Sequence, residues 1–386
     1  MITSEKTIGD KKKLYLSIAL GIWITTIFAV AIMVYIDPTK RTVTNVYYGA
    51  VSNWFLQKEI YGDKNILFHY LPQFIYLYTP FYLLDRPLGD ILWRVISLSL
   101  LVSGVYVFIR EFYPKNKEYL FLVITLIIIT PTIGALRNGQ ANLTFSGLCL
   151  WIMYFLLKEK WWALSFALTI LIILKQTGLI ITALIVSSHP HLCWRIILTI
   201  SFVIIFPFLI NNADYVLSQY KSALKEMSSL AISSERRFAD ISGLLRPFGI
   251  SLQGPNSLIL RAFAGFITLI GWLYASKRFD EPLRGILLFS LATAYLMLFH
   301  PMTEQNSYVI IAPFIALVSV YFWQEGLSKR IVYALMVICI SIGSMPEIVR
   351  PIAPHMGLWF KPMMVILFYL LTTKLVISDK FNQKAL

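Results

Sequence analysis

Basic and amide side chains stand at the ends of long apolar stretches, where charge is costly and normally serves a function. Arg137 is followed within five residues by three amides, and Lys175 lies between two apolar stretches with no acidic neighbour in sequence. Such cations suit a phosphate, because Arg and Lys neutralise its oxygens and Arg does so through two parallel hydrogen bonds. The residues that we expect to hold a phosphate are Arg137, Asn138, Gln140, Asn142, Lys175, Arg236, Arg237 and His300.

A carboxylate beside these cations would act as a general base. Asp37 closes the first apolar stretch, directly before Pro38, so we predict that it stands at the mouth of a cavity that the cations line. The base would take the proton of an acceptor hydroxyl, the hydroxyl would attack the anomeric carbon of a sugar, and the cations would stabilise the departing lipid phosphate. Asp240 and Glu304 are the alternative acids if Asp37 points away from this cavity.

Each of these polar residues also has a purely structural interpretation. Asp37 would be a helix-end acid at the headgroup level, and Arg137 would extend its side chain to the outer lipid phosphates. Arg236 and Arg237 would belong to a solvated loop, and His300 would be a hydrogen-bonded interfacial histidine. A purely structural role explains Lys175 least well, because this lysine lies between two apolar stretches.

The composition excludes several classes of protein. Of the 386 residues 58% are hydrophobic and 14% are charged, and the mean hydropathy is +0.69, whereas soluble domains have about 25% charged residues. The net charge of +14 does not indicate nucleic acid, because most basic residues lie between apolar stretches, where they orient a chain in a membrane. The sequence shows neither a compact acidic motif nor a metal-binding cysteine pattern, so we expect no metal and no cofactor.

Apolar stretches recur along the whole chain, and a helix needs about 20 apolar residues to cross a bilayer. We expect an all-α, multi-pass membrane protein of about twelve transmembrane helices that forms a single domain over residues 1–386. The fifth and sixth stretches are short and flank the polar sequence Lys175-Gln176-Thr177-Gly178, which is tolerated at membrane depth where it is buried in protein or lines a wet cavity. The stretches are 14–36, 91–109, 120–135, 143–157, 162–174, 179–186, 196–210, 258–275, 286–299, 308–323, 331–344 and 363–377.

Basic residues at every other connection predict the orientation of the chain. They precede the first stretch and return at 110–117, 158–160, 195, 277–284, 329–330 and 380–384. This pattern places both termini in the cytoplasm and two long connections, 37–90 and 211–257, on the outer side. If the apolar segment 68–84 crossed the membrane, every later connection would change sides. We therefore predict that the first outer connection forms interfacial or re-entrant helices.

The order of these motifs resembles glycosyltransferase family 87. The sequence Arg137-Asn138-Gly139-Gln140-Ala141-Asn142, followed after the next apolar stretch by Lys175, is similar to the Gly-Gln-x-Asn and intramembrane lysine pattern of that family. Further matches are Tyr47-Tyr48-Gly49-Ala50 with Tyr61, the segment 68–72 leading to Trp93, and the segment 240–246. The resemblance extends from Asp37 to about Pro313.

The resemblance implies a GT-C fold and transfer of a hexose, which is mannose in the best-known members, from a polyprenyl-phosphate sugar to a glycolipid or glycan hydroxyl. It implies inversion at the anomeric carbon and an acidic base in the first outer connection, which Asp37 supplies. Because the cations stabilise the departing phosphate and the sequence shows no acidic metal motif, we expect the reaction to be metal-independent. The chain departs from the family where an acid usually precedes the tyrosine pair, because Val43 and Thr44 stand there. In the wider GT-C superfamily the base directly follows the first helix, which favours Asp37. We therefore expect a glycosyltransferase of a bacterial-type inner membrane, with its active site facing outward.

Two other functions fit the same features. A lipid-linked glycan ligase or polymerase is also a multi-pass protein with a cationic outer loop, and it predicts that Arg236, Arg237 and His300 matter while Asp37 does not. A non-enzymatic lipid or sugar transporter would explain the broken helix pair around Lys175. The transporter predicts a matching break in the other half of the chain, and the sequence has no convincing one.

Overall fold

The computed structural model describes residues 2–61, 68–232, 238–250, 252 and 254–377 of the chain. These residues form helices joined by turns and contain no strand, so the predicted all-α fold is confirmed for this part of the chain. Buried apolar side chains make one continuous cluster that includes residues of α4 (Arg86–Phe112), α5 (Lys117–Asn138), α6 (Ala141–Leu157) and α14 (Ala312–Gln324). The packing of these helices positions the polar residues at their ends.

Eight helices of the described chain are long and apolar enough to cross a membrane. Helices α1 (Ile2–Ile36), α4 and α5 are the first three, and the fourth span is α9 (Cys193–Ile210) with the short helix η1 (Pro190–Leu192) before it. The other four are α12 (Gly254–Arg278), η3 (Gln305–Val309) continued by α14, α15 (Lys329–Val349) and α16 (Met356–Ile377). The protein is therefore a multi-pass membrane protein.

Four shorter apolar helices account for the other predicted stretches. They are α6, α7 (Trp161–Leu174), α8 (Gly178–Ser188) and α13 (Leu283–Phe299). Every predicted stretch overlaps a helix, but eight of these helices, rather than about twelve, meet the length of a full span. Whether the four shorter helices also cross the membrane stays a prediction.

Helices α7 and α8 form a hairpin. The ring of Trp161 at the beginning of α7 lies 4.6 Å from the ring of His191, which follows α8, when measured between centroids. The two helices thus run side by side in opposite directions, and the polar sequence between them forms the tip. A turn hydrogen bond from Gly178 N–H to the Lys175 carbonyl, 2.9 Å long, closes this tip.

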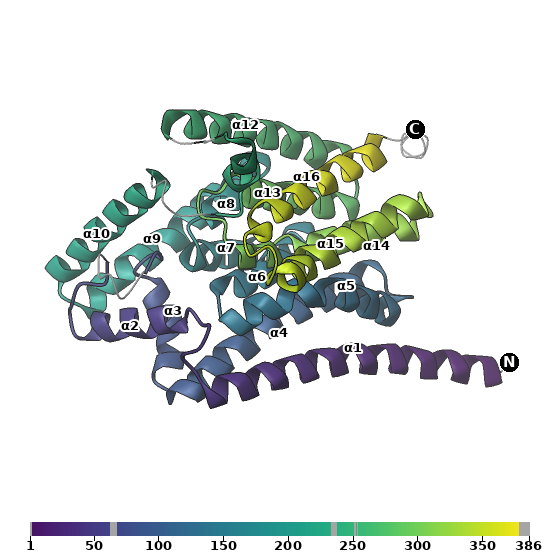
Figure 1. The fold of residues 1–386 in the computed structure, drawn as a ribbon, viewed down its shortest axis with the longest axis horizontal. Helices are drawn as coiled ribbons and strands as arrows, with labels where there is room; N and C mark the ends of the chain where they lie inside the picture. The colour runs from purple at the N-terminus through teal and green to yellow at the C-terminus, as the bar shows by residue number, and fades with distance from the viewer. Residues whose placement is uncertain (1, 62–67, 233–237, 251, 253, 378–386) are drawn as a thin grey trace.

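Several helices lie at the end of the bundle away from the N-terminus. Figure 1 shows the beginning of α1 and the end of α16 on one side of the molecule and α2 (Thr44–Phe55), α3 (Phe74–Tyr82) and α10 (Ala213–Ile232) on the other. The second long connection also contains α11 (Ile241–Leu245) and η2 (Arg246–Phe248). The described residues of the first connection thus include the helices α2 and α3, as expected, while the position of these helices at the membrane surface stays a prediction.

Helix α15 packs very closely on α5. A Cβ atom at Gly343 of α15 would lie 2.2 Å from the backbone nitrogen of Pro131 in α5, so no larger residue fits there without a shift of one helix. Small residues at such crossings let two membrane helices approach and hold a fixed distance. This contact lies beside the functional site described next.

Candidate functional site

Four polar side chains from separate parts of the chain form one continuous run of hydrogen bonds. Gln140, between α5 and α6, donates its amide N–H to Oε2 of Glu304 at 2.5 Å. Asn142 donates to Oε1 of Gln140 at 2.8 Å and to the Ser307 hydroxyl at 3.2 Å. Lys175 donates from Nζ to Oδ1 of Asn142 at 3.1 Å. We call this run, which joins a carboxylate to an ammonium group through two amides, the Glu304–Lys175 network.

The two amides of the network lie on the turn that ends α5 and begins α6. Gly139 adopts a left-handed conformation with φ of +68°, which favours glycine. Its carbonyl accepts a hydrogen bond from the Trp93 indole at 2.8 Å, and a Cβ at this position would lie 2.8 Å from Nη2 of Arg94. The turn is thereby held against α4, and both Gln140 and Asn142 are buried.

Two buried charged residues of α4 hold this turn, and we did not predict either of them from the sequence. Arg94 donates to the Leu136 carbonyl at 3.1 Å and to the Asp90 carbonyl at 2.9 Å. The Asp90 carboxylate accepts hydrogen bonds from the hydroxyls of Thr44 and Tyr78, each at 3.0 Å. The sequence did contain a sign of them: Asp90 and Arg94 are opposite charges four positions apart at the beginning of an apolar stretch. One helical turn brings residues at this spacing to the same face of a helix.

Lys175 stands at the tip of the α7–α8 hairpin, outside the eight candidate spans. Its side chain is partly buried. Burial lowers the pKa of the ammonium, and the negative charge of Glu304 raises it. The neighbouring Gln176 donates to the His69 carbonyl at 3.0 Å, which fixes the tip against the first long connection. The hairpin therefore holds a cation in a defined position at one end of the network.

His300 follows α13 and lies near Lys175. Burial lowers the pKa of the imidazole well below its ordinary value, and the charges of Lys175 and Arg261 lower it further. Its Nδ1 accepts a hydrogen bond from the Met302 N–H at 3.2 Å, so the proton of the neutral ring is on Nε2. His300 thus offers a neutral N–H donor beside Lys175 rather than a positive charge.

The structure places Asp37 outside the Glu304–Lys175 network. Its Oδ1 accepts hydrogen bonds from the Thr39 N–H at 3.1 Å and the Thr39 hydroxyl at 2.8 Å. The hydroxyl contact is the largest cause that lowers the pKa of this carboxyl, and Lys40 lowers it further. Asp37 lines a smaller cavity of about 260 Å³ together with Arg137. It is therefore a carboxylate with local partners at the end of α1.

Asp240 is the N-cap residue of α11. Its Oδ1 accepts hydrogen bonds from the backbone N–H groups of Ser242 at 2.9 Å and Gly243 at 3.1 Å. Its Oδ2 lies 3.8 Å from the guanidinium of Arg261. Burial raises the pKa of this carboxyl, while the Gly243 N–H and Arg261 lower it. The role as a helix cap accounts for Oδ1, and the contact with Arg261 accounts for Oδ2.

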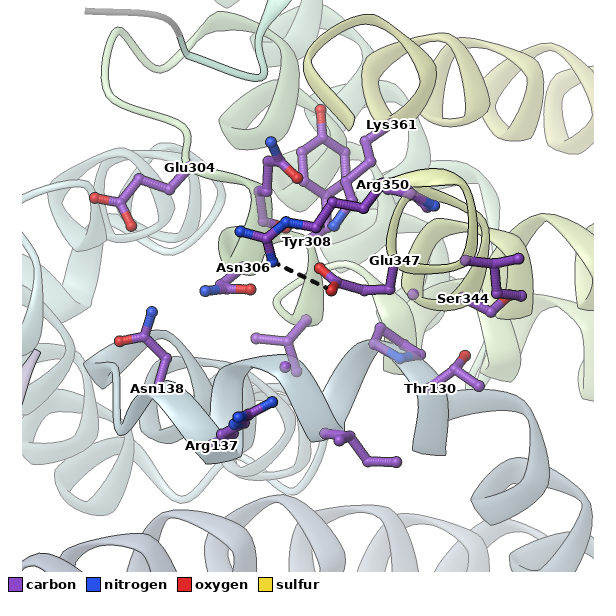
Figure 2. Close-up of a pocket in the computed structure, with 18 of the residues that line it drawn as sticks. Thr130, Arg137, Asn138, Glu304, Asn306, Tyr308, Ser344, Glu347, Arg350 and Lys361 are labelled. Atoms are coloured by element: carbon purple, nitrogen blue, oxygen red, sulfur yellow. Dashed lines mark hydrogen bonds and ion pairs between the residues drawn. The ribbon is translucent and has the colours of Figure 1, made fainter. Parts of the chain in front are cut away.

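A cavity of about 680 Å³ lies between α5, η3, α15 and α16. Arg137, Asn138 and Glu304 line it, and Figure 2 shows Glu304, Asn138 and Asn306 at the same end of the cavity. The Oδ1 atom of Asn138 is buried and has no hydrogen-bond partner among the described residues. Three predicted site residues thus share one cavity, and Glu304 connects it to the buried amides and to Lys175.

The structure does not test two of the predictions from the sequence, namely phosphate binding by Arg236 and Arg237 and a reaction without a metal. Arg236 and Arg237 lie outside the residues that the structure describes. Within the described part of the chain, no three His, Cys, Asp or Glu side chains form a group that could hold a metal ion. A role of these two arginines in phosphate binding and the independence of a metal both stay predictions.

A comparison with protein families agrees with the resemblance seen in the motifs. The model of glycosyltransferase family 87 matches residues 68–301, which is more than half of the chain. The matched segment contains Gln140, Asn142 and Lys175, whereas Asp37 and Glu304 lie outside it. No curated protein sequence matches the chain. The chain belongs to glycosyltransferase family 87 and is a membrane glycosyltransferase.

Proposed function

We propose that the protein moves a hexose from a polyprenyl-phosphate sugar to a hydroxyl group of a glycolipid or glycan at the outer face of a bacterial-type inner membrane. The observation that carries this proposal is the Glu304–Lys175 network. Sugar transfer from a lipid phosphate needs a base for the acceptor hydroxyl and a cation for the departing phosphate, and the network joins one of each.

Glu304 is the base in this proposal. Its carboxylate lines the larger cavity, where a substrate can reach it, and the Gln140 amide fixes its orientation. The carboxylate takes the proton of the acceptor hydroxyl, and the hydroxyl oxygen forms a bond to the anomeric carbon. The bond between that carbon and the phosphate oxygen breaks, and its electron pair leaves with the lipid phosphate. Asp37, our prediction from the sequence, is the alternative base, because it lines the neighbouring cavity with Arg137.

Cations and neutral donors hold the lipid phosphate in this proposal. Lys175 neutralises its charge from one end of the network, and Arg137 does so from the wall shared by the two cavities. His300 donates a hydrogen bond from Nε2, and the Asn138 side chain lines the larger cavity. The reaction then needs no metal, because these groups stabilise the leaving phosphate.

The arrangement of the helices supports a site at the outer face. Connections rich in Lys and Arg face the cytoplasm in membrane proteins. Lys11, Lys12 and Lys13 lie in the first half of α1, at the end of the bundle where α16 finishes. In the same pattern, the connections that carry the residues of the Glu304–Lys175 network alternate with the Lys- and Arg-rich ones, and we therefore expect them on the outer side of the membrane.

Transfer by the purified protein in lipid vesicles tests the proposed function. Radiolabelled mannose and glucose are offered on a polyprenyl phosphate and, in parallel, on a nucleoside diphosphate, with membrane glycolipids as acceptors and protein-free vesicles as the control. We expect transfer from at least one polyprenyl-phosphate sugar and none from either nucleotide sugar. Transfer from the nucleotide sugars, or no transfer from any lipid donor, contradicts the proposal.

A further inference from the structure

Lys361 in α16 is a buried lysine that lines the larger cavity. Its side chain is 6% exposed. The Nζ atom donates to the Gln305 carbonyl at 2.8 Å and lies 5.8 Å from the centroid of the Tyr308 ring. No carboxylate of the described residues lies within 4.0 Å of it. An ammonium has three donors, so this buried charge keeps donors for an anion, and burial without one is costly.

Positive charge is in excess on the walls of this cavity. The charged residues that line it are Arg41, Arg137, Arg350, Lys361, Glu304 and Glu347. Glu347 already pairs with Arg350 at 3.6 Å, and both side chains are 61% exposed, so this pair is weak and can open. The volume of about 680 Å³ falls within the range of ligand sites, about 300–1,000 Å³. The cavity therefore suits an anionic ligand.

The same cavity has an apolar border. Ile133 of α5 is 43% exposed and Ile348 of α15 is 69% exposed, and both line the cavity. The helices α5, α15 and α16 are all candidate membrane spans. A ligand with an anionic group for Lys361 and an apolar chain for these isoleucines matches both parts of the lining. A lipid that carries a phosphate has this composition.

Two close contacts hold the walls of the cavity in place. The contact of Gly343 with Pro131 fixes α15 on α5, and both residues line the cavity. A Cβ atom at Gly357 of α16 would lie 2.3 Å from Oε1 at the end of the Gln305 side chain, so α16 also lies close to η3. Lys361, one turn further along α16, is thereby presented from a fixed position.

We propose that this cavity binds the phosphate of a lipid substrate, with Lys361 as the buried cation and Arg137 and Arg350 nearer to the surface. That the lipid is a substrate rests on the proposed function, because Glu304 lines the same cavity. Lys361 and Arg350 lie outside the residues 68–301 that match the family. The phosphate belongs either to an isoprenyl-phosphate donor or to a phospholipid acceptor, and two probes distinguish these sources.

Binding to the purified full-length protein in detergent micelles tests this site without turnover. The probes are farnesyl phosphate, with farnesol as its uncharged control, and dihexanoyl phosphatidylglycerol, each titrated by calorimetry. Lys361→Gln keeps an N–H donor for the Gln305 carbonyl and removes the charge, and Lys361→Arg restores a cation. Lys374→Gln, at an exposed position of the same helix, is the matched control.

We expect Lys361→Gln to weaken the binding of one probe at least about tenfold, because it removes a charge-assisted hydrogen bond. Lys361→Arg and Lys374→Gln should bind that probe nearly as the wild type does. A loss for farnesyl phosphate assigns the site to the donor, and a loss for phosphatidylglycerol assigns it to the acceptor. Binding of both probes by Lys361→Gln with wild-type affinity overturns the inference.

The fold of Lys361→Gln is checked by thermal unfolding. If this variant does not fold, Arg350→Ala at its exposed position replaces it, and an unchanged affinity for both probes overturns the inference. The outcome is separate from that of the transfer assay. Lys361-dependent binding without any sugar transfer contradicts the proposed function alone, and transfer without such binding contradicts this inference alone.

Discussion

Asp37 and Glu304 are two carboxylates near Arg137, which lines one cavity with the first and another with the second. Asp37 takes its hydrogen bonds from Thr39, two residues further along the chain. Glu304 takes its hydrogen bond from Gln140, which is 164 residues away in sequence. Asp37 thus finds its hydrogen-bond donors within its own turn, whereas Glu304 obtains its donor only through the packing of distant segments.

This difference separates a residue that ends a helix from a residue that belongs to a tertiary site. An aspartate followed by a threonine satisfies its carboxylate locally, whatever the rest of the fold does. The partners of Glu304 are brought to it only when α5, α6 and η3 pack together. Because a general base must be held in a fixed position against two substrates, we expect it to be an acid of the second kind.

The largest expected effect comes from exchanging the two acids for their amides. Glu304→Gln should lower kcat for sugar transfer at least about 100-fold, because it removes the general base. Asp37→Asn, the matched control, should leave kcat close to the wild-type value, since the Asp37 carboxylate has only local partners. Transfer of labelled sugar from the polyprenyl-phosphate donor in vesicles measures both. The reverse order of the two effects would return the role of base to Asp37.

A smaller effect is expected from the cations that accompany the two acids. Lys175→Gln should lower kcat/KM for the lipid donor about tenfold to 100-fold, because a hydrogen bond to a charged group contributes about 1.5–3 kcal/mol. Lys40→Gln, which changes the lysine beside Asp37, should leave kcat/KM unchanged. Initial rates over a range of donor concentrations measure both values. An equal loss of kcat/KM in the two variants would show that Lys175 contributes no more to donor binding than Lys40 does.

The smallest effect concerns the pH dependence of stability. The unfolded chain binds a proton at His300 below its ordinary pKa of 6.5, whereas the folded protein holds this pKa much lower. The free energy of unfolding should therefore fall as the pH is lowered from 7 to 5, by at most about 1.4 kcal/mol for each pH unit. Asp37 does not contribute here, because its ordinary pKa of 3.8 lies below this range.

His300→Asn isolates this contribution, because its side-chain oxygen can still accept the hydrogen bond of the Met302 N–H. Thermal unfolding in detergent at pH 5 and pH 7 should show a smaller pH-dependent difference for this variant than for the wild type. Asp37→Asn should show the wild-type difference. If His300→Asn keeps the whole pH dependence, the histidine is not held neutral by the fold.

The helices were largely predictable from the sequence, whereas the contacts between them were not. A membrane span has to be a continuous apolar helix, since backbone groups have no water partners in the bilayer, and every predicted stretch overlaps a helix. The hairpin of α7 and α8 was predicted only as a polar break. Its tip faces Asn142 because α7 packs on α6, and a single sequence does not encode that packing in any local pattern.

The same distinction applies to the predicted polar residues: their positions were predictable from the sequence, whereas their partners were not. Gln140, Asn142 and Lys175 were recognisable because charge and amides at the ends of apolar stretches are rare. Asp37 stood out for the same reason, yet its partner lies in its own turn. The buried Asp90 and Arg94 were missed, because their partners include residues of α2, of α3 and of the end of α5, which the sequence does not place beside α4.

Restoration of activity by a small carboxylate tests most directly that Glu304, and not Asp37, is the base. Glu304→Ala and Asp37→Ala are compared for sugar transfer in vesicles with increasing sodium formate, and sodium chloride controls for ionic strength. The account predicts that Glu304→Ala is nearly inactive, that formate raises its rate at least about tenfold, and that Asp37→Ala is active with or without formate. Transfer that persists in Glu304→Ala, or that is lost in Asp37→Ala and restored there by formate, would contradict it.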